Sequence, residues 1–112
     1  MKPRNETLTR EELMTSLVYE SDTGCFRWAR QVGKKSRPGM LAGNRGINGY
    51  VRISINGVSY LAHRLAWLYM TGQWPKEDID HLNGVRHDNV WGNLRAVSRA
   101  VNLQNRRDVA GV

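Results

Sequence analysis

Residues 77–84 have the sequence EDIDHLNG, and residues 93–98 have the sequence NLRAVS. Each contains a short run that is typical of a strand, and the Asn83-Gly84 pair is typical of a turn after the first run. Ser98 is a suitable N-cap for a helix beyond the second run. The pattern predicts a unit of strand, loop, strand and helix, on which the fold of the C-terminal part depends.

A β-hairpin and a helix are predicted immediately before this unit. Residues 50–62 alternate polar and apolar side chains around an Asn-Gly pair, which is typical of a hairpin with one buried face. From His63 the apolar residues recur at helical spacing, and Gly72 is suited to end the helix. This helix is the expected core, and we expect Trp67 and Trp91 to be core residues as well.

The first 42 residues are predicted to contribute a helix, a strand and a basic loop. Thr9 and Glu12 have the spacing of a capping box, so we expect a helix over residues 10–19. The aromatic content of residues 25–29 favours a strand. Residues 30–49 hold basic side chains among five glycines and a proline, and we expect a mobile loop there.

Length and charge limit the class of protein. The 112 residues, with a mass of 12.8 kDa, fit one compact domain made of residues 1–42 and 43–112, and exclude a large barrel or doubly wound enzyme fold. The net charge of +7 and the pI near 10.2 favour an anionic partner. Nucleic acid is the commonest such partner and an acidic membrane surface the second, although some soluble proteins are merely basic.

The cysteine content and the N-terminus bear on the compartment. A single cysteine, Cys25, cannot form an internal disulfide or a cysteine-rich zinc site, which favours a reducing compartment. We find neither a signal peptide nor a run long enough to span a membrane. We therefore expect a cytoplasmic protein that does not contact a membrane.

Four side chains near the predicted unit fit metal-assisted hydrolysis of a phosphodiester. Asp80 and the amide oxygen of Asn102 are candidate ligands for a hard divalent ion, which takes oxygen donors and keeps several waters. His81 is a candidate general base that accepts a proton from the attacking water. Asn93 is a candidate for orienting the imidazole, through its other ring nitrogen or through the adjacent backbone.

These residues and their spacing resemble a known family. Asn93 lies twelve positions after His81, and Asn102 lies twenty-two after Asp80. Together with the Gly49-Tyr50 hairpin, the HRLAW run from residue 63 and the NLQNR run from residue 102, they resemble small phage and homing-type HNH endonucleases of the ββα-metal, or His-Me finger, superfamily. The resemblance covers about residues 43–107.

The resemblance implies a fold, a cofactor and roles for these residues. It implies a small α+β domain in which a hairpin and helix precede the ββα-metal unit. His81 corresponds to the general base, Asn93 to the central asparagine, and Asp80 and Asn102 to the metal ligands. Asparagine at the last position, where many members have histidine, favours one Mg²⁺ or Mn²⁺ ion over Zn²⁺. The implied setting is a bacterial or phage-infected cell.

Basic and polar residues around the unit are candidate partners of the substrate. We expect a structural or phosphate-facing role for His63, and local side-chain to backbone bonds that hold the loop for Asn89. Support of the site from outside the group of direct participants stays open for both residues. Phosphate contacts, which position DNA without reading its sequence, are expected from eight side chains. These are Lys34, Lys35, Arg37, Arg45, Arg95, Arg99, Arg106 and Arg107.

The sequence therefore predicts a metal-dependent endonuclease that cuts or nicks double-stranded DNA. Two alternatives stay open: a DNA-binding module of the same fold that does not cleave, and a basic domain that docks on an acidic protein. The choice of DNA over RNA depends on the family resemblance. Whether the protein is a monomer or a homodimer, and which sequence it recognises, stay undecided.

Overall fold

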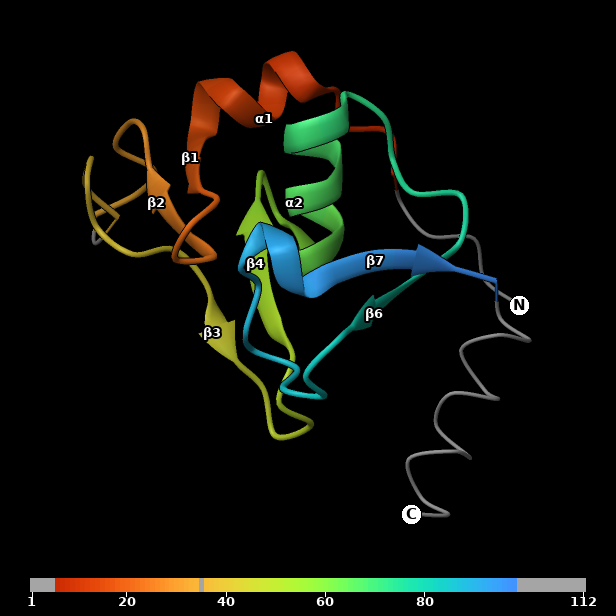
Figure 1. The fold of residues 1–112 in the computed structure, drawn as a ribbon. Helices are drawn as coiled ribbons and strands as arrows, with labels where there is room; N and C mark the ends of the chain where they lie inside the picture. The colour runs from red at the N-terminus through yellow and green to blue at the C-terminus, as the bar shows by residue number, and fades with distance from the viewer. Residues whose placement is uncertain (1–5, 35, 99–112) are drawn as a thin grey trace.

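A computed structural model describes residues 6–34 and 36–98 (Figure 1). Within these ranges the elements follow in the order α1 (Arg10–Ser16), β1 (Leu17–Glu20), β2 (Cys25–Trp28), β3 (Asn44–Arg45), β4 (Val51–Ile55), β5 (Val58–Leu61), α2 (Ala62–Thr71), β6 (Asp78–His81), the 3-10 turn η1 (Trp91–Asn93) and β7 (Leu94–Val97). The described strands form three antiparallel sheets, β1-β2, β3-β4-β5 and β6-β7. The predicted α+β class is confirmed. Neither described helix is long and apolar enough to cross a membrane.

The first helix ends earlier than predicted. The expected helix covered residues 10–19, whereas α1 ends at Ser16 and β1 follows at once. From Leu17 to Tyr19 the side chains are buried, exposed and buried in turn, which is the period of a strand. Val18 and Tyr19 are β-branched and aromatic, and pairing with β2 supplies partners for their backbone groups. The neighbouring strand therefore overrides the helical spacing.

The predicted mobile loop over residues 30–49 is instead partly paired. Asn44 and Arg45 form β3, which pairs with β4. The backbone of Met40 accepts a hydrogen bond from Trp28 at 2.9 Å, and Ala42 donates one to Phe26 at 2.8 Å. This segment supplies hydrogen-bond partners to the backbone groups at the free edge of β2, which would otherwise be unpaired. The composition of the segment does not reveal this pairing.

The second hairpin and the central helix form as predicted. Asn56 and Gly57, between β4 and β5, both have positive φ, at 52° and 81°. That is the requirement of the tight turn that Asn-Gly pairs favour. The helix α2 ends at Gly72, whose left-handed conformation closes it with a backbone hydrogen bond to Leu68.

The core surrounds α2, which Figure 1 shows between α1 and β4. Leu65 of α2 is fully buried, as is Leu13 of α1, and Ile53 of β4 is 1% exposed. Trp67 and Trp91 are half-buried against this core, with ring centroids 5.0 Å apart. The second tryptophan belongs to η1, so this contact joins the helix to the C-terminal unit.

A buried arginine ties α2 to the chain that leads into β6. Arg64 is only 4% exposed, and its Nε lies 2.6 Å from a carboxylate oxygen of Glu6. Its guanidinium also donates to the carbonyls of Pro75 at 2.9 Å and Glu77 at 3.2 Å. These bonds hold the segment that determines where β6 begins.

We expect Arg64→Met to lower the free energy of unfolding by about 3 kcal/mol, because it leaves a half-buried carboxylate and two carbonyls without their cation. Arg27→Met is the matched control. Arg27 is 42% exposed in its ion pair with Glu20, and its loss is expected to cost less than about 1 kcal/mol. Urea unfolding of both variants measures the difference, and equal costs would contradict this account of Arg64.

Candidate functional site

The imidazole of His81 lies at the end of β6, on the inner face of the β6-β7 hairpin. His81 is 7% exposed, and its Nε2 lies 2.8 Å from the side-chain oxygen of Asn89, which is 3% exposed. An amide oxygen accepts hydrogen bonds, so Nε2 carries the proton in this arrangement. In the neutral form of a ring that donates through Nε2, the lone pair is at Nδ1, which is then the atom that can accept a proton.

Aromatic rings pack around this imidazole. The His63 ring stands edge-on to the His81 ring, with centroids 5.0 Å apart. The Tyr50 ring lies 5.5 Å from His63 and 6.1 Å from His81. His63 and Asn89, for which a supporting role stayed open, thus both contact the imidazole. The sequence predicts Tyr50 only as part of a hairpin, and no pattern in it indicates that the Tyr50 ring lies beside the two histidines.

A cation missed by the sequence analysis lies next to this cluster. The guanidinium carbon of Arg86 lies 5.0 Å from the centroid of the Tyr50 ring, and Arg86 donates to the Asn48 carbonyl at 2.9 Å. The arginine comes from the loop after β6, and Asn48 from the loop before β4. Nothing local in the sequence indicates that these two loops meet.

Asp80 points to the other face of the hairpin. The burial pattern of β6 alternates, with Ile79 and His81 buried and Asp80 half-buried, because successive strand side chains face opposite ways. Asp80 pairs across the ladder with Arg95 of β7, and an oxygen of its carboxylate lies 3.3 Å from the guanidinium. β6 ends at His81, so the chain turns away directly after these two residues.

Asn93 holds the loop that joins β6 to β7. Its side-chain oxygen accepts from the Asn83 amide at 3.0 Å, and its side-chain nitrogen donates to the Asp88 carbonyl at 2.8 Å. Its own carbonyl accepts from the Leu82 amide at 2.8 Å. Asn93 therefore organises the backbone that follows His81, while Asn89 contacts the ring.

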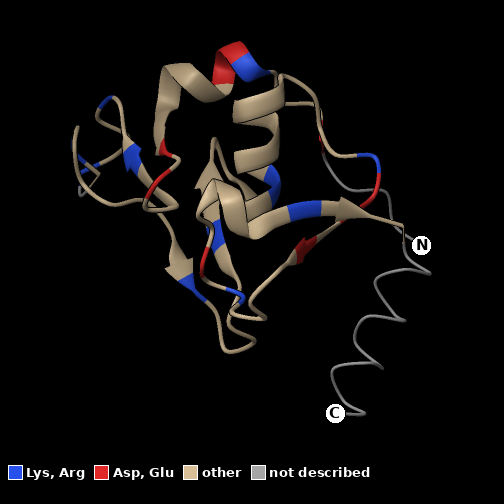
Figure 2. Ribbon diagram, viewed as in Figure 1, with Lys and Arg blue, Asp and Glu red and all other residues tan. Residues whose placement is uncertain are grey.

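Basic residues lie exposed along several elements. Figure 2 shows Lys and Arg on β2, β3, β4 and β7, and an acidic position on β6 beside β7. Lys34, Arg37, Arg45 and Arg95 are exposed, as phosphate contacts must be. Several expected features lie outside the described residues. They are the phosphate contacts Lys35, Arg99, Arg106 and Arg107, the metal ligand Asn102 and the helix after Ser98.

Asp80 is the one expected metal ligand that lies within the described residues. Residues 6–34 and 36–98 contain no group of three or more His, Cys, Asp or Glu side chains that could hold a metal ion. A site made of Asp80 and an asparagine does not require such a group, since Mg²⁺ is usually held by one or two protein oxygens and several waters. The Asp80 carboxylate, at 25% exposure, is accessible for this role.

Comparisons with known proteins relate part of the chain to a family and the fold to a solved structure. Residues 60–104 match the HNH endonuclease family model. The chain also resembles a solved structure of the HNH homing endonuclease I-HmuI, which binds and cleaves DNA, with a TM-score of 0.64 and 24% identity. That alignment covers 87% of this chain and 55% of the other, so this chain spans about half the length of I-HmuI. No curated protein sequence matches the chain.

We expect Asn93→Ala to speed hydrogen exchange at the backbone amide of Asn83, because that amide loses its acceptor. The net cost of the lost hydrogen bonds is about 1–3 kcal/mol. Exchange measured by NMR checks this. Asn48→Ala, which removes the acceptor of the Tyr50 amide in another loop, is the control and should leave the Asn83 amide unchanged. Equal exchange at Asn83 in both variants would contradict the bracing role of Asn93.

Proposed function

Since residues 60–104 match the HNH endonuclease family, we propose that this chain is a metal-dependent DNA endonuclease that hydrolyses or nicks phosphodiester bonds. The observation that carries the proposal is the bond from His81 to Asn89. With Nε2 donating to that oxygen, Nδ1 is the atom that accepts a proton in the neutral form of the ring, within the segment that matches the family. The similarity to I-HmuI, a nuclease that binds and cleaves DNA, supports DNA as the substrate.

The residues at the predicted metal position fit a hard divalent ion. Asp80 contributes a carboxylate oxygen, and Asn102 is proposed to contribute an amide oxygen, a donor set suited to Mg²⁺ or Mn²⁺. When bound, such an ion would supply positive charge that stabilises the negative charge developing on the phosphoryl oxygens and on the departing 3′ oxygen. The polar, half-exposed position of Asp80 at the end of β6 supports this role.

The side chains of this protein supply the remaining steps. The Nδ1 atom of His81 accepts a proton from a water molecule as the water oxygen attacks phosphorus and the bond from phosphorus to the 3′ oxygen breaks. Asn89 keeps the ring in the tautomer that this step requires. Asn93 keeps the backbone after His81 in place, and exposed arginines, Arg95 among them, are proposed to hold the DNA phosphates.

We expect the protein to nick supercoiled plasmid in Mg²⁺ or Mn²⁺, and we expect the nicking to stop when EDTA removes the metal. His81→Ala is expected to lower the nicking rate by about 100-fold or more, which is the usual contribution of a general base. His87→Ala, in the exposed part of the same loop, is the matched control and should keep full activity. One metal site cuts one strand at a time, so open circles should precede linear product.

Three outcomes of this assay would contradict the proposal. Nicking that survives His81→Ala, or that continues in EDTA, excludes this mechanism. Salt-sensitive DNA binding without product under any metal identifies a DNA-binding module that does not cleave. Weak binding to duplex DNA even at low salt favours a basic domain that docks on an acidic protein.

We expect Asp80→Asn to raise the Mg²⁺ concentration needed for half-maximal nicking by about tenfold, because a ligand loses its charge. The change in the unfolding midpoint should be small, since the ion pair of Asp80 with Arg95 is partly exposed to solvent. Asp78→Asn, on the same face of β6 two residues earlier, is the control. An equal metal requirement in both variants would exclude Asp80 as a ligand.

A further inference from the structure

The N-terminal hairpin touches the residue that holds the imidazole. We propose that the β1-β2 hairpin, residues 17–28, is a positioning element for His81 and acts through the backbone of Asn89. The hairpin lies outside residues 60–104, so the family match assigns it no role. The proposal rests on the proposed function in one respect, namely that His81 is the base.

The first contact is a buried hydrogen bond from β1. The hydroxyl of Tyr19 donates to the carbonyl of Asn89 at 2.5 Å, across 70 positions of sequence. Tyr19 is 6% exposed, and its ring centroid lies 4.8 Å from that of Phe26 and 5.8 Å from that of Tyr69. Burial, with the negative charge of Asp88, raises the pKa of the Tyr19 hydroxyl, so it stays protonated and remains a donor.

The second contact is made by the turn between β1 and β2. Gly24 has a φ of +78°, and a Cβ atom there would lie 2.3 Å from both the carbonyl carbon of Asn89 and the nitrogen of Val90. In the same turn, the Ser21 carbonyl accepts from the Trp91 amide at 2.9 Å. Glycine is required because the two backbones touch, and together these contacts hold residues 89–91 from one side.

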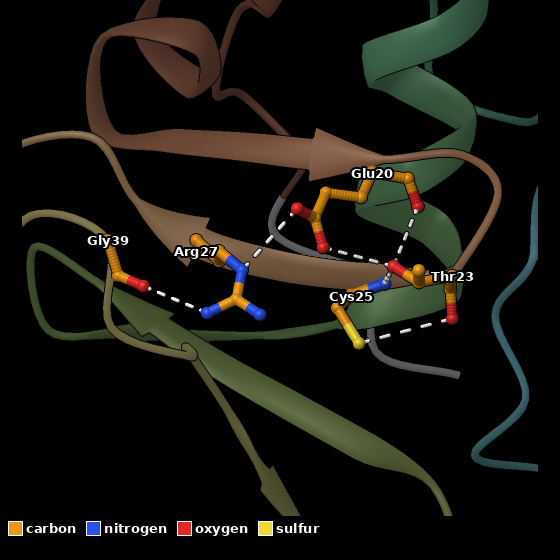
Figure 3. A network of polar contacts seen from close by, with 5 residues as sticks. All are labelled: Glu20, Thr23, Cys25, Arg27 and Gly39. Carbon is orange, nitrogen blue, oxygen red and sulfur yellow. Dashed lines mark hydrogen bonds and ion pairs between the residues drawn. The ribbon is translucent and has the colours of Figure 1, made fainter.

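Polar contacts hold the turn in this conformation, as Figure 3 shows. Glu20 accepts from the Thr23 hydroxyl at 3.1 Å and pairs with Nε of Arg27 at 3.4 Å. Arg27 in turn donates to the Gly39 carbonyl at 2.9 Å, and the Gly24 amide donates to the Glu20 carbonyl at 2.7 Å. The side-chain contacts are exposed and contribute little free energy, so they support the turn only weakly beside its backbone hydrogen bond.

Asn89 therefore links the hairpin to the imidazole, because it contacts both. Its carbonyl is held by the hairpin, and its side-chain oxygen holds the His81 ring. The residue is 3% exposed, so no solvent can replace either partner without a change in packing. A shift of this backbone moves the acceptor of Nε2, and displacements below 1 Å at a reacting group lower rates substantially.

Tyr19→Phe tests the proposal, because it removes one hydroxyl and keeps the ring. We expect the nicking rate to fall by about tenfold with the DNA dissociation constant unchanged, since the ring of His81 is misplaced while the DNA surface is intact. Tyr60→Phe, in a tyrosine that is 8% exposed and stacks on Trp74 away from this cluster, is the matched control and should keep the wild-type rate.

A second measurement does not depend on activity. Nitrogen–proton correlation spectra of the imidazoles report the tautomer and environment of His81. We expect the wild-type protein to show the form protonated at Nε2, and Tyr19→Phe to shift or broaden its signals while those of the exposed His87 stay unchanged. A purely structural role of Tyr19 would lower the unfolding midpoint without this selective change.

Gly24→Ala provides a second variant with its own control. Gly57→Ala carries the same backbone penalty, since its φ is +81°, but a Cβ atom there has nothing within 4 Å. We expect the imidazole signals of His81 to shift or broaden in Gly24→Ala and to stay unchanged in Gly57→Ala. If Gly24→Ala fails to fold while Gly57→Ala folds, the contact with Asn89 is essential to the structure, and Tyr19→Phe then decides its effect on His81.

The outcomes separate this proposal from the proposed function. A wild-type rate in Tyr19→Phe, or an unchanged His81 spectrum in that variant, overturns the positioning role. If the wild-type protein nicks no DNA under any metal but the His81 spectrum changes in Tyr19→Phe, the hairpin positions the imidazole and the nuclease function is wrong. A tenfold slower rate together with the spectral change supports both.

Discussion

The hydrogen bond between the His81 ring and the Asn89 side chain is the contact on which the candidate site depends. It is 2.8 Å long and joins two side chains that are both almost fully buried. A buried polar group that loses its partner costs far more than the bond itself contributes, so the surrounding packing must keep the two residues together. His81 and Asn89 are packed against the loop that Asn93 braces, the rings of His63 and Tyr50, and the hairpin that contacts Asn89.

The alternation of strand side chains separates the residue proposed as base from the residue proposed as metal ligand. His81 faces the interior, where its tautomer is controlled, and Asp80 faces outward, where a carboxylate is accessible and lies beside Arg95. A base benefits from a fixed environment, whereas a metal ligand must stay hydrated until substrate arrives. The short β6 ends at His81, so the adjacent residues proposed for these roles lie in different environments.

Local rules predicted much of the fold. The Asn56-Gly57 turn, the end of α2 at Gly72 and the capping box at Thr9 follow from backbone conformations and hydrogen bonds within a few residues, and each is present. The end of α1 was wrong because β2, a partner distant from any helical pattern, pairs with Leu17 to Glu20. The pairing within residues 30–49 was missed for the same reason.

The sequence by itself determined the residue types of the site and their spacing, because a strand, a tight turn and a second strand require few residues and allow few arrangements. Only the tertiary structure decided that Asn89 faces the imidazole while Asn93 braces the loop, since side-chain direction in an irregular loop depends on what packs behind it. Only the tertiary structure likewise shows that Tyr19 and Gly24 contact Asn89. Their contacts span about seventy positions of sequence, a separation at which no local propensity acts.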